Sequence, residues 1–226
     1  VDGAKDYLKF GVEVDKTSPE FIVHPPIGKW MISIGIKLFG DNEFGWRFMG
    51  ALLGTLSITL IYLIAKQLFN SIFLATSAAA LMALDGLHLV LSRTALLDIY
   101  LMFFVLLAFF TFIRKKYWWT GIALGLAIGA KWSGIYYLVT LLAIALFFEI
   151  KNRNFNKILK RIIQLFFIPS LIYIFSWSGW FFSKRGWDRQ WADERGGLFS
   201  FIPAPIRSLW HYHAEMLNFH TGLTEA

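Results

Sequence analysis

Long stretches without a charged residue, separated by short charged clusters, constrain this chain more than any other feature. The stretches are 48–65, 67–84, 99–113, 117–130, 132–148 and 162–183. A transmembrane helix needs about 20 mostly apolar residues, so four of them suffice almost alone, and 99–113 and 117–130 need flanking residues. Only 16% of all residues are charged, whereas about 25% is usual for a soluble domain. We therefore expect an all-α polytopic membrane protein with about six spans, and not a soluble bundle of core helices.

The charged clusters fall into two sets if the six stretches cross the membrane in alternation. The first set holds nine basic residues and one acidic residue: Lys66, 114–116 and 149–161. The second set holds thirteen basic and fourteen acidic residues: 1–47, 85–98, Lys131 and 184–226. The positive-inside rule places the first set in the cytoplasm. The net charge of +7 is then a topology signal, and it does not indicate a nucleic-acid partner. We expect a multi-pass protein of the cell membrane with its active side external.

Three parts follow from this topology. We expect an external loop at 1–47, a six-span region at 48–183, and the start of another external region at 184–226. Within the first loop, 22–39 is amphipathic and contains two prolines and two lysines, so it is predicted to lie as a helix on the outer leaflet. The chain begins at Val1, and we expect it to be an internal piece of a longer protein. It has no cysteine, which excludes disulfides and thiolate metal sites.

Ionisable residues gather where the second stretch ends. Asp85, His88, Arg93 and Asp98 are predicted to lie at the outer membrane boundary. Such groups are costly at that depth unless they pair or line a wet cavity, so they mark a functional site by default. The alternative is a structural ion pair of Arg93 with Asp85 or with Asp98.

Six short motifs occur in a fixed order along the chain. They are HPPIGK from His24, GWRF from Gly45, LDGL from Leu84, SRTALLD from Ser92, GAKWSG from Gly129 and WHYH from Trp210. In this order and spacing they resemble the protein O-mannosyltransferase family in its bacterial form, over nearly the whole chain. The resemblance implies a GT-C glycosyltransferase fold.

The same resemblance implies an activity and its partners. Such an enzyme moves mannose from a polyprenyl-phosphate carrier to Ser or Thr of unfolded or emerging proteins at the outer face. The implied partners are therefore the polyprenyl-phosphate-mannose donor, a protein acceptor and membrane lipid. We expect neither a cofactor nor a metal ion.

The chemistry of this transfer explains which residue types matter. A hydroxyl that attacks a sugar carbon needs a general base, usually a carboxylate, and the departing phosphate needs cations. In the family, an Asp-Glu pair early in the first external loop supplies the base, and Val1 to Ala4 resemble the stretch just after that pair. The catalytic acid is therefore expected upstream of Val1, and this piece alone is expected to be inactive.

Arg47 is the first candidate for binding the donor phosphate. It matches a family arginine at the head of the span after the first loop, where a guanidinium can bind a lipid phosphate with two hydrogen bonds. The alternative is an arginine that merely snorkels to the membrane surface. Lys29 and Lys131 are the other candidates, and each has a similar alternative as an interfacial anchor.

The remaining candidates are expected to shape the site: His24, Asp85, Arg93, Asp98, His211 and His213. His211 and His213 are two residues apart, and on a helix such positions diverge. They are therefore expected to line an acceptor groove and not to bind a metal ion.

Two other functions stay open. Another GT-C transferase could use a lipid acceptor, although HPPIGK together with WHYH favours a protein acceptor. A transporter would need ionisable residues in the middle of its spans, and the six stretches carry none.

Overall fold

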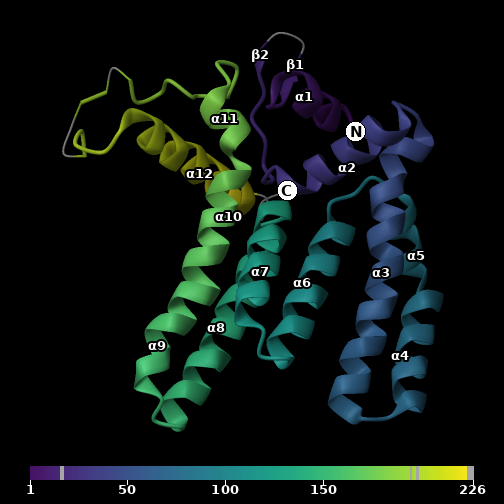
Figure 1. Cartoon of the computed structure of the whole chain (residues 1–226). Coiled ribbons are helices and arrows are strands. Elements are labelled where there is room, and N and C mark those ends of the chain that lie inside the picture. Colours follow the sequence, from purple (N-terminus) through teal and green to yellow (C-terminus); the bar gives the residue numbers. More distant parts are fainter. Residues whose placement is uncertain (16–17, 194, 197–198, 223–226) are drawn as a thin grey trace.

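Apolar helical segments run side by side through the molecule, and other helices lie across one end of them (Figure 1). The computed structural model describes residues 1–15, 18–193, 195–196 and 199–222. The side-by-side segments are α3 (Glu43–Phe69), α4 (Ile72–Leu84) with α5 (Gly86–Arg93), α6 (Asp98–Ile113), α7 (Tyr117–Ala130), α8 (Gly134–Lys151), and α9 (Phe155–Ile162) continued by the π-helical turn η1 (Ile163–Phe167) and α10 (Ile168–Ser176). They follow the six predicted stretches in order.

Length and composition decide which segments can cross a membrane. Within the described ranges, α3, α8 and the run Phe155–Ser176 qualify singly, and α4 with α5 qualify as a pair bent by 60°. The apolar helices α6 and α7 have 16 and 14 residues, which is about 24 Å and 21 Å of helix against a hydrocarbon core of about 30 Å. The all-α polytopic class is confirmed, while six complete crossings stay a prediction.

Small residues let α7 pack closely against its neighbours. Ala123 and Ala127 are fully buried. A Cβ atom on Gly121 would overlap the backbone oxygen of Gln164 in η1, and one on Gly125 would come within 2.7 Å of Ile172 in α10. Close backbone approach of this kind drives helix association in lipid, where the hydrophobic effect between helices is lost. These close contacts hold α7 against η1 and α10.

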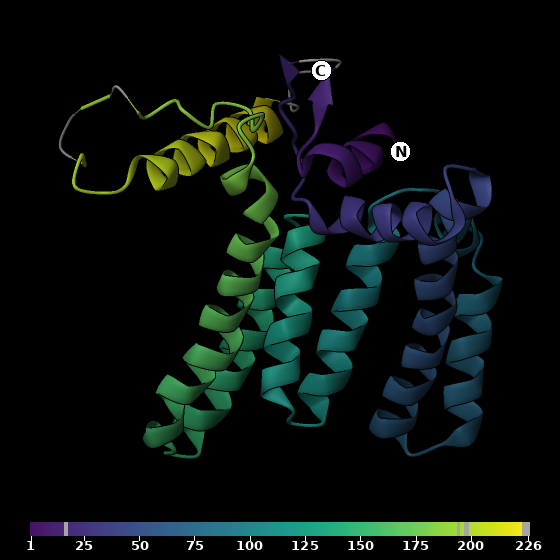
Figure 2. The ribbon, with the colours of Figure 1, turned by 45° about the horizontal axis from the view of Figure 1, so that its top comes forward.

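The helix α2 (Ile27–Phe39) lies across the ends of α3, α6 and α7 (Figure 2). Its buried face includes Ile27, Ile32 and Ile36, so the predicted interfacial helix is present. The helix begins five residues later than the predicted range 22–39, because a residue before proline is disfavoured in the α conformation and Pro25 and Pro26 follow His24.

The end of the molecule at which α2 lies is called here the capped end. It also carries α1 (Asp2–Phe10), the antiparallel strands β1 (Val14–Asp15) and β2 (Ser18–Pro19), α11 (Ser178–Phe182) and α12 (Ala204–Gly222). A buried apolar cluster joins the first loop to the C-terminal part: Val12, Val14, Ile22, Trp177, Trp180, Tyr212 and Met216. The two external parts predicted from sequence therefore form one packed layer.

Asp85 lies between two apolar helices, directly after the end of the predicted stretch 67–84. The helix α4 has 13 residues, about 20 Å of rise, and the chain then continues into α5 after a 60° bend. The Asp85 carboxylate accepts a hydrogen bond of 2.7 Å from the His88 N–H and caps α5, as aspartate does at helix starts. Asp85 therefore marks a break between two apolar helices, and its place at the outer membrane boundary stays a prediction.

Candidate functional site

The three predicted phosphate-binding cations all lie at the capped end, on different elements. Lys29 is in the first turn of α2, Arg47 lies one turn after the start of α3, and Lys131 directly follows α7. Their ion-pair partners differ, and those partners decide how free each cation is.

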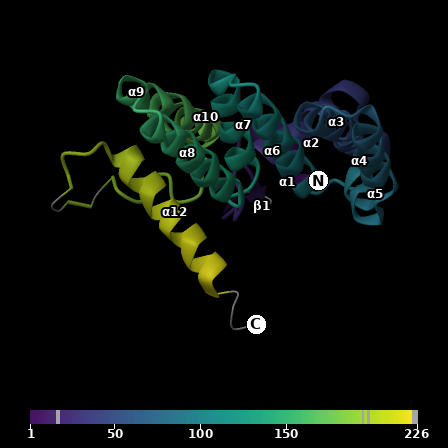
Figure 3. The same ribbon diagram turned by 90° about the horizontal axis from the view of Figure 1, so that it is seen from below.

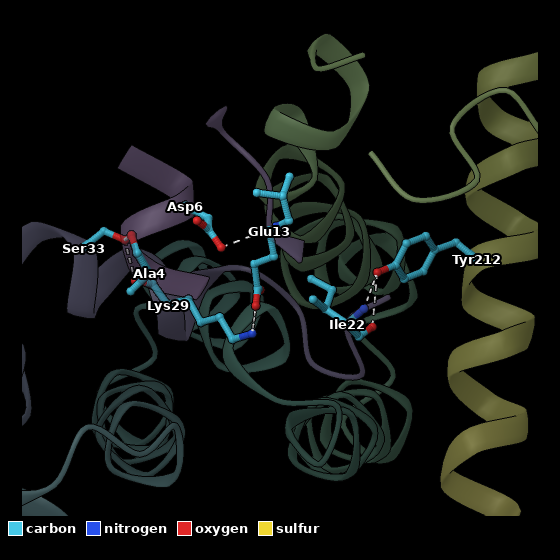
Figure 4. Close-up of polar contacts among 8 residues, drawn as sticks. Ala4, Asp6, Glu13, Ile22, Lys29, Ser33 and Tyr212 are labelled. Carbon is cyan, nitrogen blue, oxygen red and sulfur yellow. Dashed lines mark hydrogen bonds and ion pairs between the residues drawn. The ribbon is translucent and has the colours of Figure 1, made fainter. Parts of the chain in front are cut away.

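Lys29 is paired with the buried carboxylate of Glu13 (Figure 4). The Glu13 side chain is only 3% exposed and that of Lys29 is 25% exposed. The α1 helix covers the pair so closely that a Cβ atom on Gly3 would overlap the Glu13 carboxylate. Burial raises the pKa of Glu13, and Lys29 opposes that rise. Lys29 therefore neutralises a buried acid and cannot turn to another anion without leaving that acid uncompensated.

Lys131 is paired with Asp98, the first residue of α6. The Nζ–Oδ1 distance is 2.7 Å, and both side chains are partly exposed. The ion pair of Arg93 with Asp85 or with Asp98, which the sequence left as an alternative, is not formed between these described residues. Asp98 pairs with Lys131, Asp85 caps a helix, and no ion pair of Arg93 occurs in the described part of the chain.

Arg47 has the longest and most exposed ion pair of the three cations. It forms an ion pair with Glu43, one turn earlier in α3, at 3.5 Å, and the two side chains are 51% and 74% exposed. Pairs this exposed contribute about 0–1 kcal/mol. The helix begins here because Asn42 caps it, accepting a hydrogen bond from the Gly45 N–H at 3.0 Å.

The start of α1 lies beside the start of α3. Lys5 of α1 pairs with Asp41 at 3.0 Å and lies 5.5 Å from the centre of the Trp46 ring. The Trp46 indole N–H donates to Asp41 at 2.7 Å. Hydrogen bonding between Lys5 and Asp41 raises the pKa of Lys5 and lowers the pKa of Asp41. Lys5 of α1 thus contacts Asp41 and Trp46, and Trp46 directly precedes Arg47 in α3. Lys5, Asp41, Trp46 and Arg47 are together called here the Arg47 surface.

His24 lies in a second cluster, near Lys131. Its ring meets that of His220 edge to face at 5.8 Å, and Trp132 lies 5.7 Å from His220. Burial lowers the pKa of His24, and the charge of Lys131 lowers it further. His220 had no place among the predicted site residues, because only the packing of α12 on the first loop brings it to His24.

His213 belongs to a buried hydrogen-bond chain. The Trp132 N–H donates to the Tyr173 hydroxyl at 2.9 Å, and that hydroxyl lies 2.7 Å from His213 Nε2. His213 Nδ1 lies 2.7 Å from the Leu209 carbonyl oxygen. A neutral ring with its proton on Nδ1 satisfies every group, and burial correspondingly lowers the pKa of His213. His213 therefore ties α12 to α10 and to the segment after α7.

His211 lies in different surroundings from His213. It stacks on Trp191 at 4.1 Å and has Nε2 3.3 Å from the Asp188 carboxylate. The predicted divergence of the two histidines on a helix is confirmed. The described residues contain no group of three or more histidine or acidic side chains that could hold a metal ion.

Two anchoring residues were missed in the sequence. Glu13 stands between Val12 and Val14, and such alternation could have indicated a buried acid. Tyr212 is 1% exposed, and its hydroxyl accepts from the Ile22 N–H at 2.8 Å and donates to the Ile22 oxygen at 3.3 Å (Figure 4). No local pattern points to that long-range contact.

Comparison with known proteins gives consistent matches. Residues 23–180 match the family model described as dolichyl-phosphate-mannose-protein mannosyltransferase. A polyprenol-phosphate-mannose–protein mannosyltransferase of Mycobacterium tuberculosis is 35% identical, over 96% of this chain and 50% of the relative. The corresponding protein of Corynebacterium glutamicum is 31% identical, over 90% of this chain and 48% of the relative. This chain thus spans about half the length of these curated relatives.

A solved structure is also similar. The Saccharomyces cerevisiae protein O-mannosyltransferase Pmt1–Pmt2 complex, bound to its sugar donor, matches with a TM-score of 0.67 and 26% identity. The match covers 78% of this chain and 28% of the yeast chain.

Proposed function

Because the chain belongs to the dolichyl-phosphate-mannose-protein mannosyltransferase family, we propose that its protein transfers mannose from a polyprenyl-phosphate carrier to serine or threonine hydroxyls of proteins. The names of the bacterial relatives give this donor and a protein acceptor. The observation that carries the proposal is the surface around Arg47, where a loosely held guanidinium stands at the head of a membrane helix.

Arg47 is assigned to the donor phosphate. That phosphate gains negative charge as the sugar leaves, so a fixed cation stabilises the transition state more than the ground state. A guanidinium can donate two parallel hydrogen bonds to phosphate oxygens. Exchange of Glu43 for phosphate costs little, because the Arg47–Glu43 pair is long and exposed.

Lys131 and Lys29 receive separate roles. The partly exposed Lys131 is assigned a supporting contact to the donor, next to His24. Lys29 holds the first loop through Glu13, which argues against direct donor binding. His213 and Asp98 shape this part of the site through their bonds to Tyr173 and Lys131.

The remaining predicted residues are not assigned to donor binding. Asp85 caps α5, and His211 stacks on Trp191 at the outer side of α12, where it can contact an acceptor chain. The structure gives no role to Arg93.

The general base is proposed to be a carboxylate that precedes Val1. The packing of Lys5 on Asp41 and Trp46 supports this, since it holds the first turn of α1 against Trp46, the residue directly before Arg47. The reaction is proposed to occur on the external side, where the mixed-charge loops are expected.

Transfer to a peptide tests the proposal. Full-length protein in membrane vesicles is given polyprenyl-phosphate with radiolabelled mannose and a peptide rich in serine and threonine. The control peptide carries alanine at every hydroxyl position. We expect label in the first peptide only. Label that enters only a lipid fraction would instead identify a transferase with a lipid acceptor, and no transfer would refute the proposal.

A further inference from the structure

A polar hollow lies at the end of the molecule opposite the capped end. It has a volume of about 400 Å³ and is bounded by the turn between α6 and α7 and by the end of α9. Figure 3 shows this end, with α7 beside α8, α9 and α10. Its wall includes Lys115, Lys116, Trp118, Trp119, Lys160 and Arg161.

The fixed part of the hollow is Arg161. Its guanidinium bonds to the Glu149 carboxylate at 2.8 Å and to the Gln164 side-chain oxygen at 2.8 Å, and it lies 3.8 Å from the centre of the Tyr117 ring. The Arg161 and Glu149 side chains are only 13% and 10% exposed. Glu149 is the one acid in this basic set of loops, and the pair with Arg161 occupies it.

The remaining cations of the hollow are uncompensated. Lys115, Lys116 and Lys160 are exposed, and none of them forms an ion pair with any described residue. Three like charges around one hollow repel each other, and an anion between them relieves that repulsion. The hollow thus has the charge of an anion site with a rigid back wall.

The aromatic rim sets the membrane depth of the hollow. Trp118 and Trp119 are 49% and 63% exposed and begin the apolar helix α7. Exposed tryptophans at the ends of membrane helices lie at the level of the lipid headgroups. A free anion would need only the cations, whereas a lipid would also use the indole rings beside them.

The π-helical turn next to Arg161 supports a binding role independently. η1 (Ile163–Phe167) carries the buried Gln164, whose side chain holds the Arg161 guanidinium. Single π turns within α-helices occur frequently at functional sites.

We propose that this hollow binds the phosphate of an anionic membrane lipid in the leaflet opposite the capped end. Lys115, Lys116 and Lys160 supply the charge, and Trp118 and Trp119 face the glycerol and upper acyl region. Basic pockets between transmembrane helices are known to take such headgroups. The site is separate from the Arg47 surface, and its existence does not depend on mannosyl transfer.

A charge-matched pair of double variants tests the site. Purified full-length protein in neutral detergent is titrated with phosphatidylglycerol or phosphatidylcholine, and lipid-bound species are counted by native mass spectrometry. The hollow variant is Lys116→Gln with Lys160→Gln. The control is Lys151→Gln with Lys157→Gln, which removes two charges from the same end outside the hollow. All four lysines are exposed, so both variants are expected to unfold at the wild-type temperature.

We expect wild type to prefer phosphatidylglycerol. The hollow variant should bind it on the order of 25-fold more weakly, about five-fold for each lysine, and the control should bind nearly as wild type. Equal weakening in both variants would show diffuse attraction and overturn the site. Equal binding of both lipids would overturn it as well. If inorganic phosphate at the same concentration displaced the phosphatidylglycerol, the hollow would be a site for a soluble anion, and the lipid proposal would be overturned.

Discussion

The three candidate cations at the capped end differ in the ion pair that each would have to break in order to bind a ligand. Lys29 would leave Glu13, whose side chain is 3% exposed, and an unpaired buried carboxylate costs several kcal/mol. Lys131 would leave the partly exposed Asp98. Arg47 would leave only an exposed glutamate at 3.5 Å. The order of availability is therefore Arg47, Lys131, Lys29.

Arg47→Ala should lower mannosyl transfer about a hundredfold at saturating donor, because one donor to a developing anion is worth about 3 kcal/mol. Arg47→Lys should recover only part of that loss, since an ammonium cannot donate in a fixed fork. The measurement is transfer to peptide by full-length protein. Lys37→Ala, at an exposed cation of α2, serves as the control. Near-normal activity of Arg47→Ala would make Arg47 a membrane anchor and Lys131 the leading phosphate ligand.

The Glu13–Lys29 pair should respond asymmetrically to substitution. Lys29→Met leaves a buried carboxylate and should lower the free energy of unfolding by about 3 kcal/mol at neutral pH. Glu13→Gln keeps an acceptor for Lys29 and should cost about 1 kcal/mol. Thermal unfolding of the two purified variants provides the comparison. If both variants lost the same free energy of unfolding, Lys29 would not be compensating the buried charge of Glu13.

The same pair predicts a pH dependence. Burial raises the pKa of Glu13 and Lys29 opposes that rise, so Lys29→Met should raise the pKa further. When the pKa of an acid is higher in the folded state than in the unfolded state, the protein loses stability as pH rises above the unfolded pKa, which is about 4.3 for glutamate. The deficit of Lys29→Met should therefore shrink as pH falls toward that value. The double variant with Glu13→Gln should show no such change, and a constant deficit in Lys29→Met would contradict the mechanism.

At the scale of elements, charged residues made several boundaries predictable. The stretches 99–113 and 117–130 agree with α6 and α7 within one residue, because charged residues border both. The stretch 67–84 ends where α4 ends, because the charged Asp85 follows, but the sequence did not show that α5 continues the apolar segment after a 60° bend. A related limit applies to the site, where motifs singled out Arg47 and Lys131. The partner Glu43 follows from i,i+4 spacing on one helix, but the partner Asp98 depends on packing between helices.

The buried hydroxyl of Tyr212 joins α12 to the first loop. Tyr212→Phe would leave the Ile22 N–H and carbonyl oxygen without their partner at 2.8 Å and 3.3 Å. Loss of partners for buried groups costs about 1–3 kcal/mol. We expect a lower unfolding temperature and faster amide hydrogen exchange at Ile22. Tyr136→Phe, at a side chain that is 75% exposed, should change neither. Unchanged exchange in Tyr212→Phe would show that the Tyr212 hydroxyl does not hold Ile22 to α12.

At the scale of the whole molecule, the two ends have opposite characters. The capped end carries acids and bases in nearly equal number, and many of them are paired. The other end has nine basic residues and one acid, and its hollow holds three lysines that form no ion pair with a described residue. Among the described residues, the capped end has several paired, partly buried groups from which a reaction site could be built, whereas the basic end has the pair of Arg161 with Glu149.

This asymmetry predicts the orientation of the protein, and with it the side of the reaction. Ser18 lies in β2 at the capped end and Asn152 lies in the turn after α8 at the basic end, and both residues are exposed. The chain has no cysteine, so Ser18→Cys and Asn152→Cys each introduce a single thiol. Basic loops are retained in the cytoplasm during insertion, so a membrane-impermeant thiol reagent should label Ser18→Cys in intact cells. Asn152→Cys should react only after the membrane is opened. The reverse pattern would place the Arg47 surface in the cytoplasm, where emerging secreted proteins are not available as acceptors.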